Sequence, residues 1–327
     1  MKRRTVLQIA AATLAIPGWA RSQAPKVYRL GWLSTSDEAS TFPLLEGAFL
    51  KGMREMGYSV GRNLAVDARY SRGDASRLPA LTDELIALKP DVLLGIESAC
   101  RVMARKTSTI PIVILASVDP VAAGLVKSLA RPGTNVTGIS NQYRVLIAKH
   151  IELLTEIVPK LSRVALLNDA SFAGRETYER SARESAKSKG LNLTVIEAVP
   201  DPGGIRAAFE QIAKQRPQGV AVGVTGPLSF VRQAIASEAA RIRIPTVYGA
   251  SNFVDSGGLI SYGPNIAESF RTEVAPMVDR ILKGAIPAEM PVQQSAKFEM
   301  IINQKTARQI GLTIPKTVLF RADRVIE

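Results

Sequence analysis

IPIVILAS, at residues 110–117, recurs later in the chain as IPTVYGAS, at residues 244–251. The two stretches align from the Ile-Pro pair to the final serine, and each has the length of one strand. A short apolar run that ends in small or polar residues is typical of a buried strand in a parallel sheet. The recurrence therefore indicates that the chain contains two copies of one structural unit.

The elements around this pair also recur in the same order. Strands are predicted at residues 29–34 (RLGWLS) and 163–168 (RVALLN), and each is followed by an amphipathic helix that ends at Gly57 or Gly190. Glycine suits the left-handed position that closes a helix. A second strand, a helix that stops before proline, and a third strand follow in both halves. This alternation predicts βαβ units and parallel sheets.

Any two doubly wound domains could share such glycines and prolines, but they would not be expected to share six matching elements in one order. We therefore predict an α/β fold with two doubly wound parallel-sheet lobes of similar topology. Open α/β sheets bind ligands at the carboxyl ends of their strands, so a cleft between the lobes would hold the site. The candidate ligand-binding residues at these ends are Ser34, Thr35, Ser36, Glu97, Ser98, Ser117, Asp119, Asn168, Thr225, Tyr248, Ser251 and Tyr262.

Two acidic residues compete as partners for a ligand ammonium group. Asp119 precedes Pro120 and a helix expected at residues 121–130, so it could equally be the N-cap of that helix. Glu97 follows the third strand and could instead be a solvated charge. The sequence leaves both roles open for each residue.

Each of the uncharged candidates could likewise have a ligand-binding or a purely structural role. Ser34, Ser117 and Ser251 could hydrogen-bond a ligand or simply end their strands, whereas Asn168 offers both a donor and an acceptor. The tyrosines, Tyr248 and Tyr262, could form an aromatic wall or belong to the core.

The N-terminus has the pattern of an export signal. Three basic residues at positions 2–4 precede an apolar run over residues 5–20, and Ala20 and Ser22 offer small residues for cleavage. We expect residues 1–22 to be removed near Ser22 and the mature chain to be periplasmic. The adjacent arginines leave both the general and the twin-arginine export routes open.

The rest of the composition excludes several classes of function. Removing the signal takes away four basic residues and no acidic ones, which lowers the net charge from +13 to +9, and the remaining Lys and Arg are scattered. We therefore expect no nucleic-acid partner. A single cysteine, Cys100, excludes an intramolecular disulfide, and its mid-chain position excludes a lipoprotein anchor. The single histidine, His150, is expected at the surface or at a hinge. No nucleophile elbow or phosphate loop occurs, so we expect no catalytic residue, metal or cofactor.

Four stretches carry a resemblance to a known family: residues 119–138 (DPVAAGLVKSLARPGTNVTG), 257–264 (GGLISYGP), 278–315 and 321–327 (RADRVIE). They resemble the ABC-transporter substrate-binding proteins of the tryptophan-binding-protein-like family. The resemblance spans the chain from about Val27 to Glu327.

This resemblance implies a type I periplasmic-binding-protein clamshell with three crossovers between the lobes. It also implies that the chain captures a small polar, amino-acid-like solute, with aromatic ones among the ligands of the family, and delivers it to a membrane permease as a monomer. The expected lobes are residues 26–140 plus 262–285 and residues 144–258 plus 290–327. The first two crossovers are expected at Ser140 and Asn141 and at Gly257 and Gly258, and the third between Pro287 and Pro291.

Two alternatives remain from the sequence. One is a two-domain α/β enzyme of the isomerase or racemase kind, with a paired-acid or a cysteine site. A two-cysteine mechanism would need a partner for Cys100, but Pro227 or Leu228 stands at the matching position. A ligand sensor of the same fold that regulates transcription would need an N-terminal helix-turn-helix, but residues 1–26 have the signal pattern instead.

Overall fold

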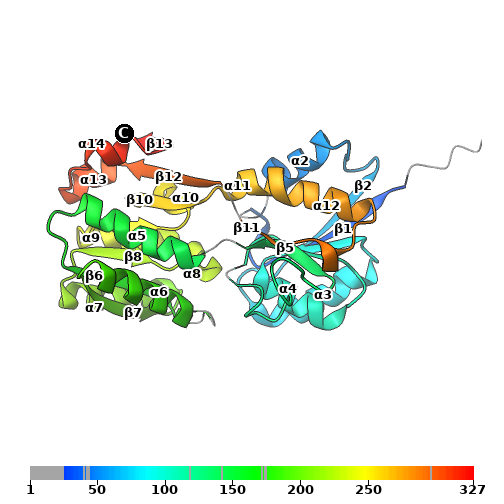
Figure 1. Ribbon diagram of the computed structural model, residues 1–327, viewed down its shortest axis with the longest axis horizontal. Coiled ribbons are helices and arrows are strands. Elements are labelled where there is room, and N and C mark those ends of the chain that lie inside the picture. Colours follow the sequence, from blue (N-terminus) through cyan, green and yellow to red (C-terminus); the bar gives the residue numbers. More distant parts are fainter. Residues whose placement is uncertain are drawn as a thin grey trace, which may run out of the picture.

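The computed structural model describes residues 26–327 except 40, 42–44, 118, 141–142, 171, 173–174 and 295–296. Two α/β lobes lie side by side along the long axis of the molecule (Figure 1). The predicted signal segment, residues 1–22, and the predicted hinge residue Asn141 lie outside the described residues. Within the described part, no helix combines the length and the apolar composition needed to cross a membrane.

Lobe 1 is built on a six-stranded sheet in the order β11-β5-β4-β3-β1-β2, in which the strand pairings are parallel. Its strands are β1 (Tyr28–Ser34), β2 (Leu64–Tyr70), β3 (Val92–Gly95), β4 (Ile112–Ile114), β5 (Val136–Ser140) and β11 (Gln293–Gln294). Strands β3 and β4 are fully buried, as expected for a parallel sheet with helices on both faces.

Helices cover both faces of this sheet. They are η1 (Leu45–Phe49), α2 (Leu50–Glu55), η2 (Ala75–Arg77), α3 (Leu78–Ala87), α4 (Glu97–Lys106), α11 (Ile266–Ser269), η3 (Phe270–Val274), α12 (Ala275–Leu282) and η4 (Pro287–Glu289). One apolar core joins the sheet to α2, η3 and α12, and a second joins it to α3 and α4. Helices α11, η3 and α12 follow one another without a break, with the π-helical turn η3 in the middle.

Lobe 2 is built on a seven-stranded sheet in the order β13-β12-β10-β9-β8-β6-β7. Its strands are β6 (Arg163–Asp169), β7 (Asn192–Ala198), β8 (Gly219–Val222), β9 (Thr246–Tyr248), β10 (Ile260–Pro264), β12 (Phe298–Asn303) and β13 (Arg324–Ile326). Its helices are α5 (Tyr143–Ile157), α6 (Arg175–Ser188), α7 (Pro202–Gln215), α8 (Gly226–Phe230), α9 (Arg232–Arg241), α10 (Ser251–Asp255), α13 (Gln304–Ile310) and α14 (Lys316–Leu319). Only the pairing of β10 with β12 is antiparallel among the described strands.

The two sheets repeat one topology. The order β2-β1-β3-β4-β5 in lobe 1 matches the order β7-β6-β8-β9-β10 in lobe 2. Equivalent backbone hydrogen bonds fix the register, and they run from Asp91 to Arg29, Leu93 to Pro111, Gln218 to Arg163 and Val220 to Pro245. Residues 110–117 and 244–251 therefore occupy the same place in the two sheets, and the predicted fold class is confirmed.

The chain passes between the lobes three times, after β5, after β10 and after β11. The first passage follows Ser140, the last residue of β5. The second follows Pro264, not Gly257 and Gly258. These glycines lie in a turn inside lobe 2, where Gly257 has a positive φ of 96° and its carbonyl accepts a hydrogen bond from Thr306. The positive φ explains the glycine there without a hinge.

The lobe boundaries shift accordingly. Residues 260–264 pair with β9 and β12 in lobe 2, whereas residues 287–294 contact lobe 1, where Thr137 donates to the Met290 carbonyl and Gln293 and Gln294 pair with β5. The third passage thus lies between Gln294 and Lys297, a few residues beyond the segment framed by prolines.

The single histidine is buried rather than at the surface. His150 on α5 has no exposed area, and its Nε2 lies 2.7 Å from the carbonyl oxygen of Tyr262 on β10. Tyr262 precedes the second passage by two residues, so His150 ties α5 to the strand that leads into that passage. Burial lowers the pKa of His150 to about 4.

Candidate ligand-binding site

The carboxyl ends of the central strands of the two sheets face each other. Ile96 follows β3 in lobe 1, and Gly226 begins α8 just after β8 in lobe 2. A Cβ atom placed on Gly226 would lie only 3.9 Å from Cδ1 of Ile96. The two lobes therefore approach each other at the carboxyl ends of β3 and β8, the edge at which open α/β sheets bind ligands.

A hydroxyl–carboxylate pair forms the lobe 1 side of this site. Ser117, directly after β4, donates from Oγ to Oε2 of Glu97 at 2.5 Å. Ser117 is buried, while Glu97 is half-buried at the start of α4. The positive end of the helix dipole favours a carboxylate there. Ser117 thus holds one oxygen of Glu97, whose side chain is only partly shielded from solvent.

The loop after β1 forms a second part of the lobe 1 side. Ser34 is buried and its Oγ shares a hydrogen bond with Thr41 at 2.7 Å and accepts one from the Ser36 N–H at 3.0 Å. The Thr35 carbonyl accepts from Gly73 N–H at 2.7 Å. Ser34 therefore shapes the loop, and Thr35 and Ser36 are the half-buried members. Ser98, the second residue of α4, is exposed.

Lobe 2 presents a comparable pair. Thr225 donates from Oγ1 to Oδ2 of Asp169 at 2.7 Å and also accepts from the Leu228 N–H, which caps α8. Asp169 has no exposed area in this arrangement. Sequence reasoning selected Thr225 but left out Asp169. Its position at the last residue of β6, beside the selected Asn168, was the signal that could have identified it.

Asn168 serves the architecture of lobe 2. It is fully buried, donates from Nδ2 to the Arg175 carbonyl at 3.1 Å and accepts from the Asp169 N–H at 3.2 Å. The amide nitrogen thus joins the end of β6 to the start of α6, and the amide oxygen accepts a hydrogen bond within β6. The structure does not place its side chain with the exposed members of the site.

The two candidate tyrosines differ in their surroundings. Tyr248 on β9 is 1% exposed and stacks on Phe253 with ring centroids 4.8 Å apart, inside the core of lobe 2. Burial raises the pKa of its hydroxyl. Tyr262 is half-buried on β10 and stacks on Phe298 at 5.7 Å. Tyr248 is therefore a core residue, and Tyr262 is the aromatic candidate near the passage between the lobes.

Ser251 begins α10, a short way after β9, which is the strand equivalent to β4. It is half-buried. Burial raises the pKa of Glu299 on β12 above its ordinary value, and the Ser251 side chain acts in the opposite direction.

Asp119 caps a turn rather than a helix. Its Oδ1 accepts from the N–H groups of Val121 and Ala122 at 3.1 and 3.0 Å, but the helix expected at residues 121–130 is absent. Gly124 has a positive φ of 69°. The N–H groups of Leu125 and Val126, which follow this glycine, both donate to the Pro120 carbonyl. The chain leaves helical geometry at this glycine, which the helical sequence pattern does not reveal.

Replacing Asp119 with alanine is expected to lower the free energy of unfolding by about 1 kcal/mol, because both capping hydrogen bonds are lost. Asp119→Asn should cost only a few tenths of a kcal/mol, roughly, since asparagine caps as well as aspartate. Urea denaturation of both variants measures the difference. Equal losses in the two variants would show that the charge, and not the cap, is what stabilises this turn.

The remaining reactive side chains offer little chemistry. The thiol of Cys100 is fully buried and donates to the Gly95 carbonyl, and burial raises its pKa, which disfavours the nucleophilic thiolate. The described residues contain no group of three or more His, Cys, Asp or Glu side chains that could hold a metal ion.

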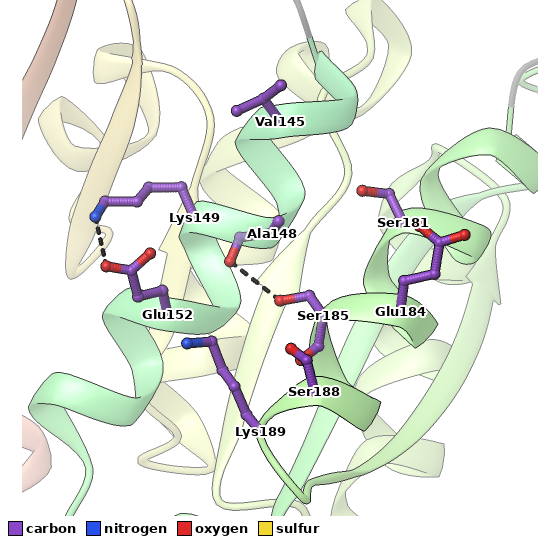
Figure 2. Close-up of a pocket in the computed structure, with 9 residues that line it drawn as sticks. All are labelled: Val145, Ala148, Lys149, Glu152, Ser181, Glu184, Ser185, Ser188 and Lys189. Atoms are coloured by element: carbon purple, nitrogen blue, oxygen red, sulfur yellow. Dashed lines mark hydrogen bonds and ion pairs between the residues drawn. The ribbon is translucent and has the colours of Figure 1, made fainter.

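A hollow of about 470 Å³ lies elsewhere, between α5 and α6 of lobe 2 (Figure 2). Its polar side chains are already engaged in part with one another: Lys149 pairs with Glu152 at 2.6 Å, and Ser185 donates to the Ala148 carbonyl at 3.4 Å. None of the candidate residues lines it. We place the candidate site at the strand ends instead, because Glu97 and Asp169 lie there, each with its carboxylate hydrogen-bonded to a hydroxyl group.

Comparison with known proteins gives one consistent result. The sequence model of the family "ABC transporter substrate binding protein" matches residues 40–326. The chain is 26% identical over 267 residues to a protein of Clostridioides difficile (strain R20291) named tyrosine-binding protein, covering 81% of this chain and 75% of that protein.

Solved structures agree. A conserved domain protein from Vibrio cholerae superposes with a TM-score of 0.83 at 27% identity, and an ABC domain from Streptococcus pneumonia in complex with L-Trp superposes with a TM-score of 0.84 at 26% identity. Each comparison covers 92% of this chain and 100% of the other.

Proposed function

The chain belongs to the ABC transporter substrate-binding protein family, and we propose that it captures an aromatic amino acid, or a close analogue, between its lobes and delivers it to a membrane permease. The observation that carries this proposal is the Ser117–Glu97 pair at the facing strand ends. A half-buried carboxylate at the start of α4 suits an ammonium group, because a charge-assisted hydrogen bond between the two is stronger than a neutral one.

The remaining groups fit the rest of an amino acid. The hydroxyls of Thr35, Ser36 and Ser98 are neutral donors for its carboxylate, and the Tyr262–Phe298 stack offers an aromatic surface for its side chain. Similarity to a tyrosine-binding protein and to a protein solved with L-Trp supports this ligand class. We further propose that residues 1–22 are removed on export and that the mature chain acts as a periplasmic monomer without a cofactor.

A thermal-shift experiment on residues 23–327 tests the ligand class. Tyrosine, tryptophan and phenylalanine are each added, with ribose as the control. A ligand that binds only the folded state at a hundredfold excess over its Kd contributes about 2.7 kcal/mol and should raise Tm by several degrees. We expect this rise for at least one aromatic amino acid. A rise with ribose alone would overturn the proposed ligand class.

A further inference from the structure

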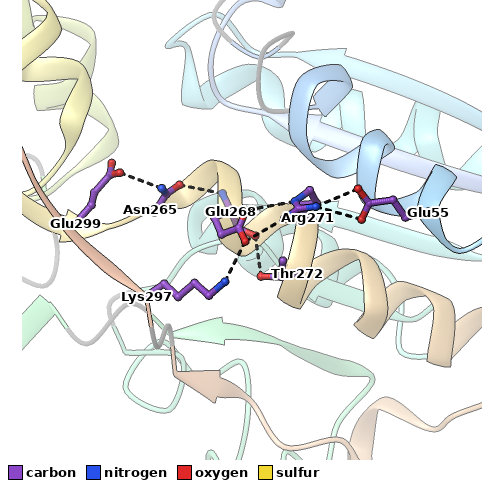
Figure 3. Close-up of polar contacts among 7 residues, drawn as sticks. All are labelled: Glu55, Asn265, Glu268, Arg271, Thr272, Lys297 and Glu299. Atoms are coloured by element: carbon purple, nitrogen blue, oxygen red, sulfur yellow. Dashed lines mark hydrogen bonds and ion pairs between the residues drawn. The ribbon is translucent and has the colours of Figure 1, made fainter. Parts of the chain in front are cut away.

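Polar contacts join the described residues that flank the second and third passages between the lobes (Figure 3). The Asn265 N–H donates to the Lys297 carbonyl at 3.0 Å, which connects the residue after β10 to the residue before β12. The side chains around this backbone contact form a continuous network, here called the hinge network. It consists of Glu55, Asn265, Glu268, Arg271, Lys297 and Glu299.

Glu268 is the centre of the hinge network. Its carboxylate receives Lys297 Nζ at 2.9 Å from the third passage and the Arg271 guanidinium at 3.2 Å from η3. The hydrogen bond from Arg271 makes the largest contribution and the one from Lys297 the second largest, and together they lower the pKa of Glu268 to about 2. One carboxylate thus holds cations from two segments that are far apart in the sequence.

The network is anchored to lobe 1 through Arg271. Its Nη1 donates to Glu55 on α2 at 3.0 Å. A glycine makes this approach possible, because a Cβ on Gly52 would lie 2.6 Å from the Arg271 carbonyl oxygen and 2.8 Å from Cβ of Ala275. The helix of the second passage therefore packs directly on the backbone of α2.

Asn265 carries the network into lobe 2. Its Oδ1 caps α11 by accepting from the Glu268 N–H at 2.9 Å, and its Nδ2 donates to Oε2 of Glu299 on β12, also at 2.9 Å. The two amide atoms of one side chain thus link the helix that packs on lobe 1 to strand β12 of lobe 2.

We propose that the hinge network acts as a clasp: it holds the two lobes in the arrangement in which Ile96 lies next to Gly226. Asn265 and Lys297 are then positioning residues for ligand capture. The proposal rests on the proposed function, since it assumes that the lobes close on a ligand. Rotation of the lobes must change the backbone of both passages. The hinge network therefore favours one relative orientation of the two lobes over the others. This preference contributes to the affinity for the ligand.

Asn265→Asp is the most informative variant. Aspartate keeps the cap on α11, because it caps as well as asparagine. It replaces the Nδ2 donor with an oxygen that faces Glu299, so attraction becomes repulsion at the link between the lobes. Lys297→Met removes the cation but keeps a side chain of similar length. Lys106→Met is the matched control, since Lys106 makes an ion pair with Asp83 at 2.6 Å inside lobe 1.

Two readouts are measured on each variant. Small-angle scattering without ligand gives the radius of gyration, and stopped-flow binding of tyrosine or tryptophan gives Kd and the dissociation rate. We expect Asn265→Asp and Lys297→Met to increase the radius of gyration and to raise Kd about two- to fivefold through faster dissociation, the size that exposed ion pairs provide. Lys297→Arg should restore both values, and Lys106→Met should change neither.

Wild-type scattering and affinity in Asn265→Asp and Lys297→Met would overturn the clasp, as would tighter binding. The two proposals fail separately. If wild-type protein binds neither amino acid, the proposed ligand class fails, and the radius of gyration without ligand still decides whether the network holds the lobes together.

Discussion

Replacing Glu97 with glutamine is expected to weaken binding of tyrosine or tryptophan by about ten- to a hundredfold, the loss that accompanies removal of a charge-assisted hydrogen bond. Glutamine keeps the length of the side chain, and its amide oxygen can still accept from Ser117, which donates to Oε2 of Glu97 at 2.5 Å. The fold should therefore be preserved, and what changes is the charge that faces the ligand ammonium group.

Ligand analogues separate this effect from a general loss of binding. Analogues that lack the ammonium group, 3-(4-hydroxyphenyl)propionate for tyrosine and indole-3-propionate for tryptophan, should bind the wild-type protein weakly. Glu97→Gln should bind these analogues about as well as wild type does, so that the preference for the amino acid largely disappears. Isothermal calorimetry measures all of these affinities.

Asp119→Asn is the matched control for Glu97→Gln, because it neutralises the other acidic candidate and keeps its cap. We expect it to bind tyrosine and tryptophan as the wild type does. A large loss in Asp119→Asn together with wild-type affinity in Glu97→Gln would reverse the assignment of the ammonium partner.

The topology is predictable from the sequence because it depends on local patterns that recur. Residues 110–117 and 244–251 match letter for letter at their ends, and the structure gives them equivalent neighbours in the two sheets. Parallel pairing follows from the βαβ units, since parallel strands need a crossover connection between them. The resemblance to substrate-binding proteins is confirmed by the family match.

The site is less predictable because a strand end fixes where a residue lies and not where its side chain points. Asn168 and Asp169 are neighbours at the end of β6, and tertiary packing decides that Asn168 binds the start of α6 while Asp169 meets Thr225. Alternation along β9 likewise sends Tyr248 into the core. None of these choices is written in the spacing of polar residues.

The passages between the lobes are a further feature that the sequence does not predict well. Paired glycines at 257 and 258 suggest a hinge, yet the passage follows Pro264 and is held by side chains from distant segments, among them Glu55 and Lys297. Contacts between residues so far apart in the sequence leave no local pattern. Only the assembled structure reveals the hinge network.

The second large effect is expected from acid. His150 is fully buried and its Nε2 lies 2.7 Å from the Tyr262 carbonyl oxygen, which can only accept, so the neutral ring carries its proton on Nε2. Nδ1 is buried and has no hydrogen-bond partner among the described residues. Protonation would place a positive charge and an unpaired N–H in the core, which is why burial lowers the pKa of His150 to about 4.

The sign of the pH dependence follows from this shift. The unfolded chain binds a proton at His150 near pH 6.5, while the folded chain does so only near pH 4. Between these values the unfolded state holds more protons, so stability falls as the pH falls through this window. From pH 7 to pH 5 this residue alone should lower the free energy of unfolding by about 2 kcal/mol.

Urea denaturation of the wild type and of His150→Gln at pH 7 and pH 5 isolates this contribution. Glutamine can donate to the Tyr262 carbonyl and does not titrate, so any packing cost it brings is the same at both pH values. Carboxylates such as Glu268 titrate equally in both proteins and cancel in the comparison. The wild type should therefore lose about 2 kcal/mol more than the variant between the two pH values. Parallel losses would mean that His150 can take up a proton in the folded protein, and that its contact with Tyr262 does not keep the ring neutral.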